Sequence, residues 1–268
     1  MGMALFERQG INNIVSEVSD YFNSPKKRKS KMKKTLICSA VASSLFAGAA
    51  FAELSADGSV SATSDYRFRG ISQTDENAAL QGEINLNHSS GIHAGVWGSS
   101  IDFGESADGE NFKLEVDYTV GYAFAISGVD LDLGYVYYSY PNSNDDTVDA
   151  DFGEVYGNAS YKGFEVGVNW SDDYFQESGK STYVYTGASH KFGIVTVAGT
   201  VGYTFFDEKD VFETGTDKYV DYSVSAAVDV LKNLNVEVAY VGTDLHKDDI
   251  GGADWAEDTF VASVTLSL

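Results

Sequence analysis

Cysteine and proline are nearly absent from this chain of 268 residues, which contains one cysteine and two prolines. A single cysteine excludes an intramolecular disulfide scaffold and argues against a cysteine-based metal cluster. Basic residues are also few, because 18 lysines and arginines stand against 40 acidic residues. This imbalance argues against a nucleic-acid-binding protein, which needs a basic surface. No apolar run reaches the roughly 18 residues that a membrane-spanning helix requires.

Residues 32–52 have the pattern of a secretory signal peptide. Lys33 and Lys34 precede a short apolar stretch, and the stretch ends in the small-residue site Ala50-Phe51-Ala52. We therefore expect cleavage before Glu53, and we interpret residues 1–31 as an extension upstream of a translation start at Met32. Residues 53–268 then form the exported domain, with 37 acidic and 10 basic residues.

The exported domain alternates between apolar and polar residues with a period of two. Over residues 114–126 the even positions are all apolar, whereas the odd positions are charged, polar or small. Side chains alternate between the two faces of a β-strand, so each such segment has one apolar and one polar face. The pattern predicts twelve strands, near 57–71, 79–89, 91–103, 111–126, 129–140, 150–161, 164–175, 181–191, 193–205, 217–231, 233–243 and 257–268.

The connections between these strands alternate in length. Short glycine- or asparagine-containing turns follow every second strand, for example at 127–128 and 162–163, and longer polar loops follow the others, for example at 141–149 and 206–216. This layout is typical of a transmembrane β-barrel with short periplasmic turns and longer extracellular loops. The predicted fold class is therefore an all-β, 12-stranded antiparallel transmembrane barrel.

Period two alone also fits a soluble β-sandwich or a lipocalin-like barrel, in which the apolar face would point inward. Two features favour the membrane barrel. The polar face is rich in small residues, as a crowded lumen requires, and aromatic residues collect near the strand ends of the apolar face, as in an interfacial girdle. The residues expected in this girdle are Phe68, Tyr137, Trp170, Tyr203, Phe205, Tyr240 and Phe260.

The string S-D-Y-R-F-R-G-I-S-Q-T over residues 64–74, together with residues 80–82, 88–91 and 94–99, resembles the TorF-type porin family of proteobacteria. This string is specific to the family, whereas the rest of the chain shows only sequence features that are common to outer-membrane barrels. The resemblance implies an outer-membrane location and a pore, without a substrate. The chain departs from the common pattern of outer-membrane strands at its last residue, because it ends in Leu268 instead of an aromatic residue.

A barrel of twelve tilted strands has a backbone diameter of roughly 24 Å, and side chains would leave a passage on the order of 10 Å. Two arginines among many carboxylates form either a buried charge network or a charged constriction, and we favour the network because buried charges need partners. Strand parity predicts that the following charged residues face the lumen: Arg67, Arg69, Glu83, Glu115, Asp117, Asp130, Asp132, Glu165, Asp221, Asp229 and Glu237.

The surplus of carboxylates predicts an outer-membrane channel for passive diffusion of ions or small solutes, with a preference for cations. A non-conducting structural or adhesion barrel has the same sequence pattern and stays open as an alternative. A lipid hydrolase using His88 and Ser90 is a further alternative, but no third orienting group and no G-x-S-x-G motif accompany them, so we expect no enzyme.

The predicted partners follow from this location. They are outer-membrane lipid and lipopolysaccharide, the barrel-insertion machinery during biogenesis, and small solutes, with no nucleic acid. The acidic loops lack the D-x-D-x-D-G spacing of a calcium loop. The histidines also lack ligand spacing, so we expect no metal site and no cofactor.

Overall fold

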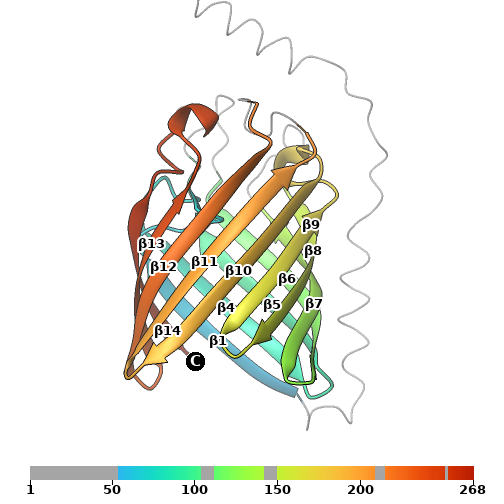
Figure 1. Cartoon of the computed structure of the whole chain (residues 1–268), viewed down its shortest axis with the longest axis vertical. Helices are drawn as coiled ribbons and strands as arrows, with labels where there is room; N and C mark the ends of the chain where they lie inside the picture. The colour runs from blue at the N-terminus through green and yellow to red at the C-terminus, as the bar shows by residue number, and fades with distance from the viewer. Residues whose placement is uncertain (1–53, 104–111, 142–149, 209–214, 251–252) are drawn as a thin grey trace, which may run out of the picture. The chain divides into compact units, whose positions relative to one another are not determined.

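The computed structural model describes residues 54–103, 112–141, 150–208, 215–250 and 253–268. Twelve antiparallel strands close into a barrel, in the order β1-β14-β13-β12-β11-β10-β9-β8-β7-β6-β5-β4 (Figure 1). Every consecutive pair is antiparallel, and β1 closes the ring by pairing with β14 and β4. The fold class predicted from the sequence is therefore confirmed. The barrel strands are β1 (Leu54–Thr63), β4 (Ala79–His88), β5 (Ile92–Ser100), β6 (Leu114–Ile126), β7 (Val129–Ser139), β8 (Phe152–Tyr161), β9 (Phe164–Ser171), β10 (Ser181–Phe192), β11 (Val195–Phe206), β12 (Lys218–Leu231), β13 (Leu234–Thr243) and β14 (Thr259–Ser267).

Two short strands and two 3-10 helices complete the described elements: β2 (Arg67–Phe68), β3 (Ile71–Ser72), η2 (Phe175–Glu177) and η3 (Lys247–Ile250). Among the residues that the structure describes, no helix is long and apolar enough to cross a membrane. The predicted signal peptide at 32–52 and the upstream segment 1–31 lie outside the described residues.

Tight turns join the strands at one end of the barrel. Ser127-Gly128 joins β6 to β7, and Lys162-Gly163 joins β8 to β9, with positive φ at all four residues. Two consecutive positive φ angles define the type I′ turn, whose twist matches that of the flanking strands. We call this the turn end of the barrel, and we call the opposite end, where the longer connections lie, the loop end.

The apolar residues of the strands point outward, and the polar residues point into the lumen. Val166 on β9 is 54% exposed and Val238 on β13 is 47% exposed, although both lie within a fully paired sheet. Apolar side chains exposed in this way form a belt around the barrel instead of a core. The structure therefore excludes the soluble sandwich, in which these residues would be packed inside.

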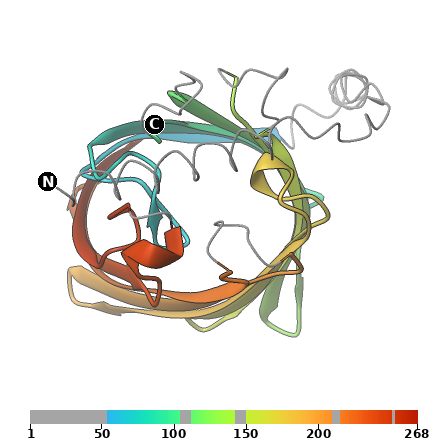
Figure 2. The same ribbon diagram turned by 90° about the horizontal axis from the view of Figure 1, so that it is seen from above.

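The predicted first strand was too long. It was expected to run from 57 to 71, but β1 ends at Thr63 and the chain then leaves the barrel wall. Residues 64–78 fold inward and form the β2–β3 hairpin (Figure 2). The strand parity that places Arg67 and Arg69 in the lumen also predicts that Tyr66 and Phe68 face the lipid. That prediction is wrong, because both pack against a buried cluster inside the barrel. Residues 65–69 continue the alternation of β1, so parity could not reveal that the strand ends at Thr63.

Aromatic side chains fill much of the lumen at the loop end. One cluster includes Tyr138, Tyr140 and Phe152, and Tyr66 and Phe68 of the inward segment pack against it. A second cluster consists of Phe206, Tyr219, Leu245 and Ala256, and Ile71 of β3 and Ile250 of η3 pack against it. The buried core of this barrel thus lies inside its loop end, around the hairpin.

A luminal hairpin as the candidate functional site

The β2–β3 hairpin turns at Arg69 and Gly70, which have φ angles of 48° and 83°. Two consecutive positive φ angles give a two-residue type I′ turn, so Arg69 takes a left-handed conformation that non-glycine residues rarely adopt. Strain of this kind persists only where surrounding contacts enforce it, and it is common at functional sites. The specific string at 64–74 therefore encodes a hairpin inside the barrel instead of a stretch of wall.

Arg69 lies at the tip of the hairpin and reaches the far wall of the barrel. Its Nη2 donates to both carboxylate oxygens of Glu154 on β8, at 2.8 and 2.7 Å. Its guanidinium also lies 4.2 Å from the ring centre of Tyr183 on β10. Because β8 and β10 flank β9, which lies opposite β1 in the ring, the hairpin extends across the lumen.

The Arg69–Glu154 pair is almost fully removed from solvent, with side-chain exposures of 5% and 1%. Burial by itself would lower the pKa of Arg69, but the Glu154 carboxylate together with Tyr174, Tyr138 and Tyr219 raises it, so the pKa lies above its usual value. Arg69 therefore keeps its charge at every physiological pH. The hydroxyl of Tyr138 and the side-chain amide of Asn169 also donate to Glu154, at 3.2 and 3.1 Å.

Arg67 anchors the base of the hairpin. Its Nε donates to Asp65, and its Nη1 donates to the backbone carbonyls of Trp255 at 2.7 Å and Glu257 at 3.0 Å. Asp65 also accepts hydrogen bonds from Ser72 and Thr74, at 2.7 and 3.0 Å. These bonds tie the hairpin to itself and to the β13–β14 connection. Arg67 thus has a structural role, because it holds the β2–β3 hairpin in place.

Gly70 allows the hairpin to touch the wall on its other side. A Cβ atom at this position would collide with the side chain of Thr243 on β13 and would lie 3.1 Å from Cβ of Asp221 on β12. The contacts of Arg69 and Gly70 together place the hairpin tip between β8 and β10 on one side and β12 and β13 on the other.

A group of carboxylates lies beside the hairpin. The hydroxyl of Tyr66 is 3.5 Å from Glu115 on β6, which is 2% exposed, and Asp117 follows on the same face of β6. Burial, together with the nearby Glu115 and Asp117, raises the pKa of Tyr66 well above its usual value. Tyr66 therefore stays protonated and can donate to the carboxylate. Acidic side chains thus concentrate where the hairpin narrows the passage.

A polar cavity of about 440 Å³ adjoins the hairpin. Tyr183 and Asp221 both line this cavity, and the hydroxyl of Tyr183 donates to Asp221 at 3.2 Å. Charged side chains on its wall come from both the hairpin and the strands, and serine and threonine hydroxyls surround them. The lining includes Asp65, Arg67, Arg69, Tyr183, Asp221 and Glu237.

The other residues predicted to face the lumen are spread along its length. Glu83 accepts a hydrogen bond from Ser59 at 3.0 Å in the middle of the barrel. Asp132 accepts from His93 at 2.9 Å nearer the turn end. Asp130, Glu165 and Asp229 lie at the turn end and are exposed. The structure therefore brings Arg67, Arg69, Glu115, Asp117 and Asp221 to the hairpin, with Glu237 in the adjoining cavity, and leaves Glu83, Asp130, Asp132, Glu165 and Asp229 away from it.

Sequence reasoning missed the main partner of Arg69. Glu154 lies in a strand whose alternation is weak, because the aromatic residues Phe152 and Tyr156 share its face and the small residues Gly153 and Gly157 lie on the opposite face. The exposed Val155 marks the outer face of β8, and parity from that residue would have placed Glu154 in the lumen. The ion pair between Arg69 and Glu154 could not be predicted from the sequence, since it depends on the inward turn of the chain after Thr63.

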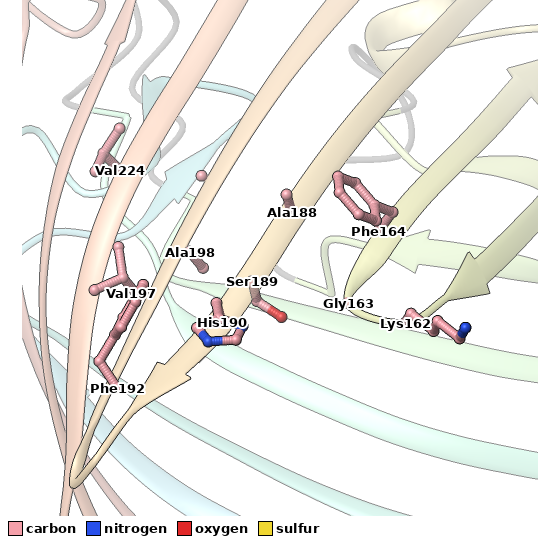
Figure 3. Close-up of a pocket in the computed structure, with 11 residues that line it drawn as sticks. Lys162, Gly163, Phe164, Ala188, Ser189, His190, Phe192, Val197, Ala198 and Val224 are labelled. Carbon is pink, nitrogen blue, oxygen red and sulfur yellow. The ribbon is translucent and has the colours of Figure 1, made fainter.

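A second hollow, of about 410 Å³, lies on the outer face at the turn end (Figure 3). Phe164, Phe192 and Val197 line it, and the small side chain of Ala188 leaves the space between them. His190 shares this face and packs edge-on against Phe192, with ring centres 4.5 Å apart. This hollow lies outside the lumen and has no contact with the hairpin.

A family model described as "Bacterial protein of unknown function (Gcw_chp)" matches residues 47–268. The chain belongs to this family. The match covers all of the Gcw_chp barrel, including the hairpin, and the family description carries no activity. A comparison of the sequence with curated proteins gives no match.

Solved structures share the barrel fold of this Gcw_chp protein. The NanC porin structure is similar with a TM-score of 0.50 and 10% identity, over 80% of this chain and 99% of that one. A structure from a study of in-meso crystallization of membrane proteins has the same TM-score and identity, over 80% and 83% of the two chains. Outer membrane phospholipase A from Escherichia coli has a TM-score of 0.42 and 10% identity, over 80% and 89%. For the two structures with a TM-score of 0.50, an identity of 10% shows a shared fold alone.

Proposed function

We propose that this protein is an outer-membrane channel through which ions and small solutes diffuse passively, with a preference for cations. The observation that carries the proposal is the charged hairpin across a polar lumen. A barrel that served only as a scaffold would gain nothing from buried acids around the passage, because each buried charge is costly without a partner. A constriction lined by charge is how channels select ions.

The sign of the selectivity follows from the balance of charge at the hairpin. Arg69 is neutralised by Glu154, and Arg67 by Asp65. Glu115, Asp117 and Asp221 face the same region, and among the described residues no basic side chain forms an ion pair with them. Cations should therefore enter more readily than anions.

Planar-bilayer recordings test this function. Across a potassium chloride gradient, we expect a reversal potential on the cation-selective side, and we expect Asp117→Asn to shift it towards zero because one luminal carboxylate is lost. Asp229→Asn, at the exposed turn end, serves as the matched control and should shift it less. Anion selectivity of the unaltered protein would contradict the proposal.

An outer-membrane location is part of the same proposal, and the exposed apolar belt supports it. Val201 on β11 is 52% exposed and lies near the middle of its strand, whereas its neighbour Thr200 lines the luminal cavity. We expect Val201→Arg to lower the free energy of unfolding in lipid vesicles by about 2–4 kcal/mol, since a charge on the lipid face near the midplane costs that much.

Thr200→Arg is the matched control for Val201→Arg. It should leave the free energy of unfolding nearly unchanged and lower the conductance, because it adds a long side chain to the lumen. Equal losses of stability for the two variants in a urea titration would argue against a lipid-facing belt.

A closed structural or adhesion barrel is the second candidate, and the aromatic packing inside the loop end favours it. The two aromatic clusters and the hairpin fill space that an open pore would leave to water. The bilayer recordings separate the two candidates, because a closed barrel would carry no current at any voltage.

We do not propose a lipid hydrolase. Nδ1 of His88 lies 2.8 Å from the hydroxyl of Ser90, but the same nitrogen lies 3.1 Å from the backbone N–H of Ser90 within a tight turn. A turn contact accounts for this geometry. Export through the segment 32–52, kinship with TorF-type porins, and contacts with lipopolysaccharide and the insertion machinery remain proposals that accompany the channel.

A further inference from the structure

Two buried polar atoms in the luminal cavity have no hydrogen-bond partner among the described residues: Nη1 of Arg69 and Oδ2 of Asp221. Both residues line the cavity of about 440 Å³. The Arg69 side chain is 5% exposed, and Asp221 is 7% exposed. Leaving a buried donor or acceptor unpaired is costly. The cavity therefore favours an occupant that accepts from one atom and donates to the other.

Tyr183 holds these two groups beside one another. The guanidinium of Arg69 stacks over its ring, and its hydroxyl donates to Oδ1 of Asp221 at 3.2 Å. Gly202 on β11 provides the room for this arrangement, because a Cβ atom there would collide with the Tyr183 hydroxyl and the Asp221 carboxylate. Oδ1 of Asp221 is thus occupied, while Oδ2 is left for a second donor.

The charges on the cavity wall decide which kind of occupant fits. Both arginines already have carboxylate partners, Glu154 for Arg69 and Asp65 for Arg67. Asp221 and Glu237 line the same cavity, and in the described part of the chain no basic residue is paired with either. A neutral solute would leave this negative charge uncompensated, and an anion would increase it. The occupant should therefore carry a positive charge.

We infer that the cavity is a binding site for small organic ammonium compounds that also carry hydroxyl groups. The ammonium group binds at Oδ2 of Asp221, and a hydroxyl oxygen accepts from Nη1 of Arg69. Glu237 pairs with Ala227, six residues along β12 from Asp221, so it adds negative charge to the far end of the cavity. Ser223, Ser225 and Thr200 line the cavity and can bind further hydroxyls. The inference rests on the proposed channel function, since it names the class of solute that would pass the hairpin.

Two matched probes test this site by isothermal titration calorimetry on the folded barrel in detergent at pH 7. 2-Amino-1,3-propanediol and glycerol have the same skeleton and differ by an ammonium group in place of one hydroxyl. We expect saturable binding of the amine and at least tenfold weaker binding of glycerol. Asp221→Asn should weaken binding of the amine about tenfold, because one charge-assisted hydrogen bond is lost.

Asp229→Asn removes a carboxylate outside the cavity and should leave the affinity for the amine unchanged, which controls for net charge. Equal binding of glycerol and the amine, unchanged binding by Asp221→Asn, or no binding to the folded protein would each overturn the inference. Calorimetry needs no current through the barrel. If the barrel binds the amine but carries no current in bilayers, the channel is refuted and the binding site stands. If the barrel conducts but does not bind the amine, the binding site is refuted and the channel stands.

Discussion

Replacing residues 64–78 with the dipeptide Asn-Gly is expected to raise the single-channel conductance several-fold. Thr63 and Ala79 already pair across β1 and β4, so a two-residue type I′ turn can join them without disturbing the register. The change removes the hairpin that crosses the lumen between β8, β10, β12 and β13. Conductance follows the narrowest cross-section, and a twelve-stranded barrel without this hairpin is roughly 24 Å across its backbone.

The twelve-stranded wall should survive this deletion, because all its strand pairs remain. Glu154 would lose Arg69, but it would then face water in a wider lumen. A matched control replaces Ser127 with Asn, which alters a turn at the opposite end while keeping its type I′ geometry. Planar-bilayer recordings of both proteins decide the matter, with folding checked by circular dichroism. An unchanged conductance in a folded deletion variant would mean that the hairpin does not limit the passage.

Arg69→Ala is expected to lower the free energy of unfolding by about 3–5 kcal/mol. The side chain of Glu154 is 1% exposed and would keep its charge in a site without a cation. Breaking a buried ion pair by removing one partner costs this much, since the remaining charge stays buried and uncompensated. Tryptophan fluorescence during a urea titration in detergent micelles measures the change by linear extrapolation.

Two further variants separate the buried charge from lost packing. The double variant Arg69→Met with Glu154→Gln removes both charges and keeps two side chains of similar length, so it should recover a large part of the loss. Lys191→Ala breaks a pair whose side chains are 57% and 61% exposed, and it should cost no more than about 1 kcal/mol. A loss for Arg69→Ala no greater than for Lys191→Ala would contradict the role of the buried pair.

The barrel wall could be predicted from local pattern because each strand carries its own information. Residues 114–126 show which face is apolar without reference to any other strand, and the turns at 127–128 and 162–163 carry the glycine that a type I′ turn needs. Strand order then follows from short connections, since consecutive strands pair. The same parity placed Glu115, Asp117 and Asp221 on the luminal face.

The hairpin could not be predicted in this way. Residues 65–69 continue to alternate after Thr63, so their pattern is the same whether they form wall or hairpin. The choice depends on contacts that are distant in sequence: Arg67 with the carbonyl of Trp255, and Arg69 with Glu154. Strand parity assigns a residue only to one of the two faces of an assumed wall strand. It therefore predicted that Tyr66 and Phe68 face the lipid.

The sequence by itself determined a twelve-stranded barrel with an apolar outer face and an acidic lumen, because period two and turn chemistry act over neighbouring residues. Only the tertiary structure decided that the segment after β1 crosses the barrel, that Glu154 is the partner of Arg69, and that a cavity with an unpaired donor and an unpaired acceptor lies beside them. These features arise from side chains that are far apart in the sequence and come into contact only when the barrel closes. Local sequence pattern does not show which of these side chains will meet.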